Sequence, residues 1–310
     1  MGERMKQLIV AAVLLVFSGG IGYSDEAPSI AVIKGQSIAP YGKALWGFKK
    51  HIKGRGFDAR VIEYGLEGKK GGELERLSKG IKSHNPKLVL TLGTPATRFA
   101  RETMGTIPVV FAMVLSPERS GILAPGISMD VPFETKLTNL KQILPHANRI
   151  GMIYSSETIS SYEEAANTCA KLGFDLFAKR IDSQKDFTGA FKDMAKEIDS
   201  FVMIPDSKIY FPKLVEYLLL ESLREKIPVV GLSSAYAKAG ALVAFDCDYE
   251  NLGEQAGELA LRILAGKASA VTQIVRPREV NLSLNLLAAK RLEVEIDPTI
   301  IGRAHEVFGQ

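Results

Sequence analysis

Hydroxyl, carboxylate and small residues recur just after five apolar segments of the sequence, and such groups bind polar solutes through hydrogen bonds. Each apolar segment is predicted to be a buried strand. Ligands of open α/β sheets bind beyond the carboxyl ends of the strands, so residues at these positions are the first candidates for a binding site. The candidates at these positions are Ser37, Tyr41, Gly93, Thr94, Pro95, Ser155, Ser156, Asp206, Ser233 and Tyr236. Asp246, at an expected crossing between two lobes, is a further candidate.

The segment LVLTLGTPATRF (residues 88–99) predicts an anion site at the start of a helix. Thr94 is expected at the N-cap, and Pro95 in the first turn, where its missing N–H costs nothing. Gly93 allows the backbone to approach a ligand closely. The unpaired amides and the helix dipole favour a negative charge by roughly 0.3–1 kcal/mol, or ~2 kcal/mol when partly buried.

Four residues of the second half extend this prediction to a ligand that carries both a carboxylate and an ammonium group. Ser155 and Ser156 are expected to help Thr94 hold a carboxylate from the opposite side, and Asp206 is expected to face a ligand ammonium. The alternative for each is a helix or turn cap, since Ser, Thr and Asp cap helices without any ligand. Asp246 either reaches the ligand or only fixes the chain where it passes between two lobes.

Aromatic residues near the strand ends add a possible stacking surface. Tyr41 and Tyr236 lie in loops on the expected ligand side and have rings that can stack on a flat ligand. Trp46 lies between Leu45 and Phe48 in a predicted helix, so it is expected in the core.

Signatures of catalysis and of metal binding are absent from the sequence. It contains no G-x-S-x-G, no G-x-x-x-x-G-K-[ST], no C-x-x-C and no H-E-x-x-H. The histidines are scattered over predicted helix ends and loops: His51, His84, His146 and His305. We therefore expect a binding protein without cofactor or metal, and not an enzyme.

Composition and charge are those of an ordinary globular chain and give no reason to expect nucleic acid as a partner. Of its 310 residues, 46% are hydrophobic and 24% are charged, and the formal net charge is +4. That charge is small for this length, so it provides no electrostatic surface for nucleic acid or for an anionic membrane.

The N-terminus has the pattern of a secretory signal peptide. Arg4 and Lys6 precede an unbroken apolar run at 8–17, and small residues follow up to Ser24. The run is shorter than the roughly 18 residues that span a bilayer. We therefore predict a signal peptide over residues 1–24 and export of the remaining chain to the periplasm. There Cys169 and Cys247 could pair, although two small buried apolar residues are the preferred interpretation.

Strands alternate with helices along the chain, which predicts two α/β lobes with parallel sheets. The two series span about 25–130 and 133–246. A final helix over 251–266, with Asn251 and Glu254 at capping-box spacing, precedes a single predicted strand within 272–282. A return of this helix to the first lobe would make the chain cross between the lobes more than once.

Four segments taken in order resemble a known family of ABC-importer solute-binding proteins that includes tryptophan- and phenylalanine-binding members. They are GTPATRFARETMGTIPVVFAMVLSPERSG, LKQILPHANRIGMIYSS, IPVVGLSSAYAKAGALVAFDCDYENLGEQAGELALRILAG and VNLSLNLLAAKRLEVEI. The resemblance implies a type I periplasmic-binding-protein fold with two Rossmann-like lobes, three hinge crossings and a ligand cleft between the lobes. It places residues 25–131 and 247–273 in the first lobe and residues 132–246 and 274–310 in the second.

The function that this resemblance implies is capture of a small solute by closure of the two lobes, followed by delivery to a membrane permease of an ABC importer. The implied ligand is amino-acid-like, with aromatic amino acids among the options. The chain is expected to act as a monomer. Two alternatives remain open, a periplasmic ligand-sensing subunit of a signalling receptor and a secreted α/β enzyme.

Overall fold

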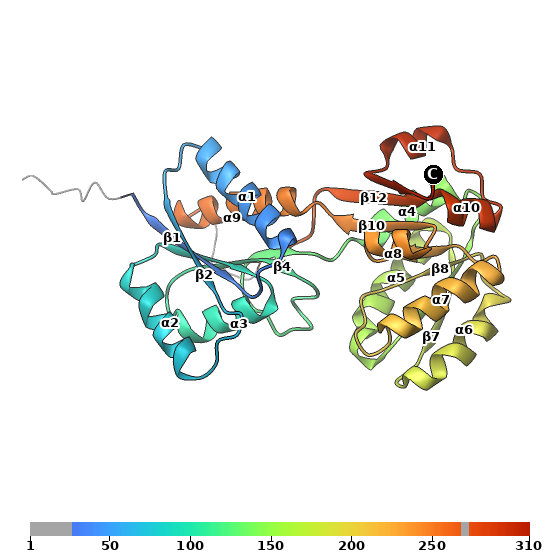
Figure 1. Cartoon of the computed structure of the whole chain (residues 1–310), viewed down its shortest axis with the longest axis horizontal. Helices are drawn as coiled ribbons and strands as arrows, with labels where there is room; N and C mark the ends of the chain where they lie inside the picture. Colours follow the sequence, from blue (N-terminus) through green and yellow to red (C-terminus); the bar gives the residue numbers. More distant parts are fainter. Residues whose placement is uncertain (1–26, 268–272) are drawn as a thin grey trace, which may run out of the picture.

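The computed structural model describes residues 27–267 and 273–310, and the predicted signal peptide lies outside the described residues. Two α/β lobes lie side by side along the long axis of the molecule (Figure 1), and each is built around its own sheet. The predicted fold class, two lobes with mostly parallel sheets, is confirmed. Within the described residues no helix is long and apolar enough to span a membrane.

The first lobe has a six-stranded parallel sheet in the order β11-β5-β4-β3-β1-β2. Its elements are β1 (Ser29–Lys34), α1 (Ala39–Gly54), β2 (Arg60–Gly65), α2 (Gly72–Ser83), β3 (Leu88–Leu92), α3 (Thr94–Thr103), β4 (Val109–Val114), β5 (Gly126–Ser128), α9 (Tyr249–Leu264) and β11 (Ile274–Val275).

The second lobe has a seven-stranded sheet in the order β13-β12-β10-β9-β8-β6-β7, in which only the β10–β12 pair is antiparallel. Its helices are α4 (Phe133–Ile143), η1 (Ser156–Thr158), α5 (Ile159–Leu172), η2 (Gln184–Asp186), α6 (Phe187–Ala195), α7 (Pro212–Arg224), α8 (Ser234–Ala239), α10 (Leu286–Leu292) and α11 (Pro298–Arg303). Its strands are β6 (Arg149–Tyr154), β7 (Asp175–Arg180), β8 (Ser200–Val202), β9 (Val229–Gly231), β10 (Val243–Cys247), β12 (Val280–Asn285) and β13 (Glu306–Phe308).

Strand β1 shows why these sheets are covered on both faces. Ile30 and Val32 pack on one face with residues of α1 and α9, whereas Ala31 and Ile33 pack on the other with residues of α2 and α3. Successive side chains of a strand point to opposite faces, so an uninterrupted apolar strand requires helices on both sides. The apolar runs of the sequence therefore determine a three-layered lobe.

Three short segments join the lobes, and together they are called the hinge below. They are residues 129–132, residue 248 and residues 276–279, which connect β5 to α4, β10 to α9, and β11 to β12. The single strand expected within 272–282 is wrong, because β11 and β12 belong to different sheets. Pro277 separates them, and proline cannot donate a ladder hydrogen bond. The third crossing accordingly follows Val275, not residue 273.

Helices α1 and α9 lie beside each other on one face of the first lobe (Figure 1), in unusually close contact. A Cβ atom at Gly253 would overlap the backbone carbonyl of Ala44, and one at Gly47 would overlap that of Glu250. Only glycine at these two positions permits this approach. The final helix thus returns to the first lobe and sets where the second and third crossings begin and end.

Two helix starts differ from the sequence expectation. Gly93 is the N-cap of α3, and Thr94 is the first helical residue, because the turn out of β3 needs φ of 89°, which glycine alone adopts without strain. Pro95 lies in the first turn as predicted. The N-cap of α9 is Asp248, whose carboxylate accepts a 2.8 Å hydrogen bond from the Asn251 N–H, so Asn251 is not the cap.

Trp46 lies on the surface, 62% exposed, so its expected place in the core is wrong. The buried residues of α1 include Tyr41, Leu45 and Phe48, which share one face, and Trp46 is rotated by about 100° from Leu45. Cys169 and Cys247 are both buried and unpaired, which confirms the preferred interpretation of the cysteines.

Candidate functional site

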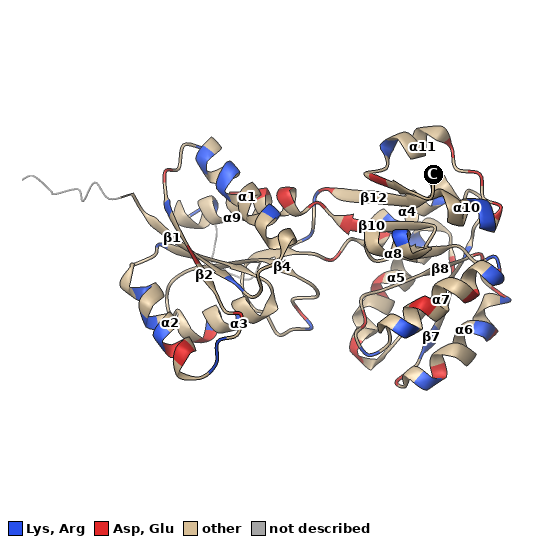
Figure 2. Ribbon diagram, in the orientation of Figure 1, with Lys and Arg blue, Asp and Glu red and all other residues tan. Residues whose placement is uncertain are grey.

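A cavity of about 600 Å³ lies between the lobes, beside the hinge. Its walls come from the segment after β4, from α4 and α5, from the ends of β8, β9 and β10, and from the hinge itself. A cavity of this size holds a small organic solute. Basic and acidic residues are interspersed over both lobes and around the hinge (Figure 2).

Three of the predicted site residues line this cavity: Ser233, Tyr236 and Asp246. Ser233 stands at the N-cap of α8 but makes no side-chain cap hydrogen bond, so its hydroxyl is available to a solute. The Asp246 carboxylate accepts a 3.1 Å hydrogen bond from the Ser234 N–H. Burial raises the pKa of Asp246, and it also raises the pKa of Tyr236.

The five candidates of the first lobe lie away from the cavity. Thr94 and Pro95 line one surface pocket at the ends of β1 and β3, and Ser37 lines another nearby. Tyr41 is buried in the lobe core with its hydroxyl against Gly93, where a Cβ atom would overlap it. Tyr41 therefore helps to shape the Gly93 turn, and its stacking on a ligand stays a prediction.

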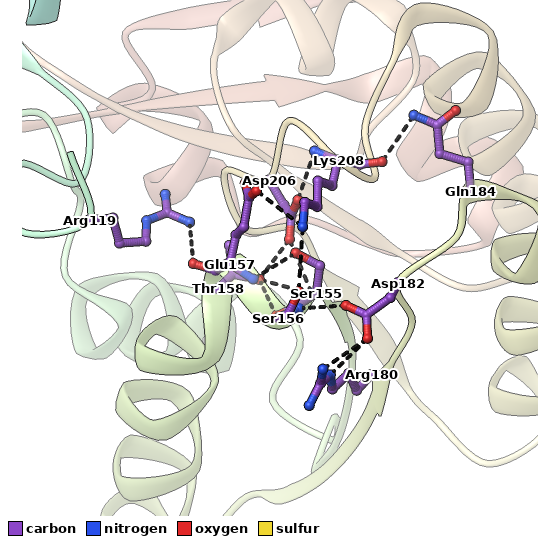
Figure 3. A network of polar contacts seen from close by, with 10 residues as sticks. All are labelled: Arg119, Ser155, Ser156, Glu157, Thr158, Arg180, Asp182, Gln184, Asp206 and Lys208. Atoms are coloured by element: carbon purple, nitrogen blue, oxygen red, sulfur yellow. Dashed lines mark hydrogen bonds and ion pairs between the residues drawn. The ribbon is translucent and has the colours of Figure 1, made fainter.

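Ser155, Ser156 and Asp206 form a polar network within the second lobe (Figure 3). The Asp206 carboxylate accepts from the Ser155 N–H (3.1 Å), from the Thr158 hydroxyl (2.6 Å) and from the Lys208 N–H (3.0 Å). Ser155 caps η1, and the Ser156 N–H donates to Asp182 at 2.9 Å. These contacts give the three residues a positioning role, and direct contact with a ligand stays a prediction for each.

Asp206→Ala is expected to lower the free energy of unfolding by about 2 kcal/mol, because the buried Ser155 amide and Thr158 hydroxyl lose an acceptor. Urea denaturation measures the change. Asp182→Ala is the matched control, since its carboxylate also accepts from this loop but is exposed to solvent, and it should change stability much less. An unchanged stability with weakened solute binding would instead assign Asp206 to the ligand.

Six charged residues of the cavity wall were not predicted from the sequence: Glu118, Arg119, Asp130, Lys136, Glu164 and Arg276. Glu164 of α5 forms a two-pronged ion pair with Arg276 of the third crossing, with N–O distances of 2.8 and 2.9 Å. It also accepts from the Phe133 N–H at 3.2 Å. Glu164 thus ties the third crossing to α5 and also holds the start of α4, which directly follows the first crossing.

Asp130, in the first crossing, is held by the first lobe. Its carboxylate accepts from the Ser116 N–H (2.7 Å), from the Ser116 hydroxyl (3.1 Å) and from the Ser128 hydroxyl (2.6 Å). Arg119 lies in the same loop after β4 as Ser116. Its guanidinium donates to the backbone carbonyls of Glu157 (3.3 Å, Figure 3) and Pro205 (3.2 Å), which belong to the second lobe. The loop after β4 therefore connects the lobes on the cavity side.

No sequence motif marks these residues. Lys136 and Glu164 lie within helices, and Asp130 and Arg276 follow the short strands β5 and β11, which the sequence analysis did not resolve as separate strands. Across the described ranges 27–267 and 273–310, no group of three or more His, Cys, Asp or Glu side chains is placed to hold a metal ion. What the cavity offers is hydrogen-bond donors, acceptors and both signs of charge, which suits a small polar or zwitterionic solute.

Two solved structures illustrate the fold that this chain shares with known proteins. One is the ligand-free, open structure of a substrate-binding protein with adhesive properties from Clostridium difficile, with a TM-score of 0.72 and 20% identity over 91% of this chain and all of the other. The second is an ABC domain from Streptococcus pneumonia in complex with L-Trp, with a TM-score of 0.62 and 19% identity over the same shares.

Sequence comparison agrees with the fold. A tyrosine-binding protein of Clostridioides difficile (strain R20291) is 23% identical over 269 residues, which are 82% of this chain and 77% of that protein. The family model for ABC transporter substrate-binding proteins matches residues 30–308, which include both lobes, all three crossings and every residue that lines the cavity. The chain belongs to the family of ABC transporter substrate-binding proteins.

Proposed function

We propose that the chain is the extracytoplasmic solute-binding component of an ABC importer and that it encloses a small amino-acid-like ligand by hinged closure of its lobes. The observation that carries this proposal is the cavity of about 600 Å³ lined by both lobes and the hinge. Rotation of one lobe relative to the other about the three short crossings changes the distance between the cavity walls. A ligand that contacts the walls of both lobes therefore favours the closed state.

An aromatic amino acid is the ligand that the cavity and the relatives support best. Tyr236, Tyr249 and Phe245 line the cavity and provide aromatic surface, whereas Asp246 and Ser233 provide polar contacts. The relatives include a tyrosine-binding protein and a domain solved with L-Trp. In this role Asp246 pairs with the ligand ammonium, and the rings contact the side chain.

Delivery to a permease, export through a cleaved signal peptide and a monomeric state belong to the same proposal. The closed protein would present both lobe tips to the membrane component. Loss of uptake of the bound amino acid on deletion of the gene distinguishes transport from sensing, and size-exclusion chromatography with light scattering tests the monomer. Saturable binding without turnover separates a binding protein from an enzyme.

Asp246→Asn is expected to weaken binding of L-tyrosine, L-tryptophan or L-phenylalanine by about 10- to 100-fold, because a charge-assisted hydrogen bond to the ammonium is lost. Isothermal titration calorimetry measures the affinity. Burial raises the pKa of Asp246, so binding to the wild type should decline as the pH falls, and it should start to do so at a higher pH than for an exposed aspartate.

Asp248→Asn is the matched control for this experiment. Asp248 is two residues away and caps α9, it does not line the cavity, and asparagine caps a helix equally well. Equal affinities of the wild type and both variants would leave Asp246 with a hinge role only. Small-angle scattering on the same samples should show a smaller radius of gyration with ligand, and a constant radius would contradict hinged closure.

A further inference from the structure

Lys136 is a buried lysine that lines the interlobe cavity. It lies in the first turn of α4, immediately after the first crossing, and only 6% of its surface is exposed. Its ammonium is 5.8 Å from the centroid of the Phe133 ring, a cation–π contact. Burial of an ammonium is costly unless a partner compensates it, so the position calls for a partner.

The carboxylates near this ammonium are already used by other groups. Both oxygens of Glu164 accept from Arg276, and both oxygens of Asp130 accept from Ser116 or Ser128. Within the part of the chain that the structure describes, no hydrogen bond or ion pair engages the Lys136 ammonium.

The other two cations of the cavity differ from Lys136 in this respect. Arg276 is neutralised by Glu164, and Arg119 donates to two backbone carbonyls and to the Ser116 hydroxyl at 2.5 Å. Lys136 is therefore the cation of the described cavity wall whose donors remain unused. Three free N–H donors on a buried positive charge are complementary to a carboxylate.

We infer that Lys136 binds the carboxylate of the solute that enters the interlobe cavity. This rests on the proposed function and assigns one group of its ligand. Asp246, on β10, remains for the ammonium, so a zwitterion would be held by a cation next to the first crossing and an anion next to the second. The ligand then contacts residues that flank two hinge segments, and its binding is coupled to the angle between the lobes.

The surroundings of Lys136 also make this carboxylate contact pH-dependent. Burial lowers the pKa of Lys136 to about 8, Asp130 and Glu164 partly oppose that change, and Arg276 adds to it. The remaining charged residues of the cavity wall are Glu118, Arg119 and Asp246. A bound carboxylate stabilises the ammonium and raises this pKa again, so the complex should take up a proton when it forms near pH 8.5.

Lys136→Met tests the assignment, and Lys141→Met is its matched control. Lys141 lies on the same helix and also has its ammonium over an aromatic ring, that of Phe174 at 5.2 Å, but it does not line the cavity. The probes are L-tyrosine, tyramine, which lacks the carboxylate, and 3-(4-hydroxyphenyl)propionate, which lacks the ammonium.

Lys136→Met should bind L-tyrosine and the propionate about 10- to 100-fold more weakly than the wild type and tyramine equally well. Lys141→Met should match the wild type for all three probes. Calorimetry at pH 8.5 in two buffers of different ionisation enthalpy should show proton uptake with L-tyrosine in the wild type and none in Lys136→Met.

Equal losses for tyramine and L-tyrosine in Lys136→Met would overturn the assignment, since they would show a general effect on the cavity. A wild type that binds none of the three probes would refute the aromatic ligand but not yet Lys136. A thermal-shift panel of other amino acids, dicarboxylates, keto acids and sugar acids then decides. A stabilising carboxylate whose effect disappears in Lys136→Met supports Lys136, and a panel without any stabilising carboxylate overturns it.

Discussion

Lys136→Met is expected to raise the free energy of unfolding of the ligand-free protein by roughly 2–3 kcal/mol at pH 7. The pKa of Lys136 in the folded protein is about 8, against an ordinary value of 10.5. That difference corresponds to roughly 3 kcal/mol of destabilisation when the lysine is charged in both states, and loss of the contact with Phe133 returns about 0.5–1 kcal/mol. Methionine fills a similar volume without a charge.

The pH dependence of this stabilisation has a definite sign. Below pH 8 the lysine is protonated in the folded and unfolded chains, and the wild type carries the whole cost of a buried charge. Between pH 8 and 10.5 the unfolded state binds the extra proton, so wild-type stability rises with pH. The advantage of Lys136→Met should therefore be largest at pH 7 and nearly vanish above pH 10.5.

Guanidinium denaturation of the wild type and of Lys136→Met from pH 7 to 10.5 measures the difference between their free energies of unfolding. The titration of all other groups contributes equally to both proteins and cancels in this difference. A variant less stable than the wild type at pH 7 would mean that an internal partner compensates Lys136, and it would remove the reason to seek one in a ligand. A more stable variant that has lost ligand affinity would be an instance of stability given up at a functional position.

Gly253→Ala is expected to lower the free energy of unfolding by about 3 kcal/mol, at the upper end of what overpacking costs. The added Cβ atom would overlap the Ala44 carbonyl, which is backbone in the middle of α1 and cannot turn aside. Helices α1 and α9 must then separate. Thermal or urea unfolding measures the change.

Gly42→Ala, on α1, is the matched control for that substitution. Nothing lies within 4 Å of a Cβ atom at Gly42, so alanine there should stabilise the protein by about 0.5–1 kcal/mol through its better helix propensity. If both variants stabilised the protein, the close approach of α1 and α9 would be refuted.

A shift of α9 should also reach the hinge. The helix begins directly after the second crossing, and its Glu258 forms a 2.9 Å ion pair with Arg278 of the third. The Asp248 N–H further donates to the Glu279 carbonyl at 3.2 Å, which holds these two crossings together. Gly253→Ala is therefore expected to alter solute affinity as well, although it lies outside the cavity.

The sequence was sufficient to predict the lobes and part of the site, because the signals involved are local. Apolar runs that alternate with helical spacing predicted two parallel-sheet lobes. Polar residues after a predicted strand led to Ser233 and Tyr236, and the expected crossing between the lobes led to Asp246; all three line the cavity. The preference for polar residues after strands also selected Asp206 and Ser155, but in the structure these two residues are hydrogen-bonded to each other and do not line the cavity. Residues at strand ends meet at one edge of the sheet, whether or not a ligand also contacts them.

The ion pair at the hinge and the buried lysine of the cavity wall could not be predicted in this way, because their surroundings are built from segments that are distant in the chain. Glu164 and Arg276 are 112 residues apart, and neither has a local pattern that points to the other. Lys136 resembles any surface lysine of a helix until the first crossing and α5 enclose it. Local periodicity determines which residues form strands and helices, whereas burial and charge pairing depend on which elements the chain returns to, and only the tertiary structure decides that.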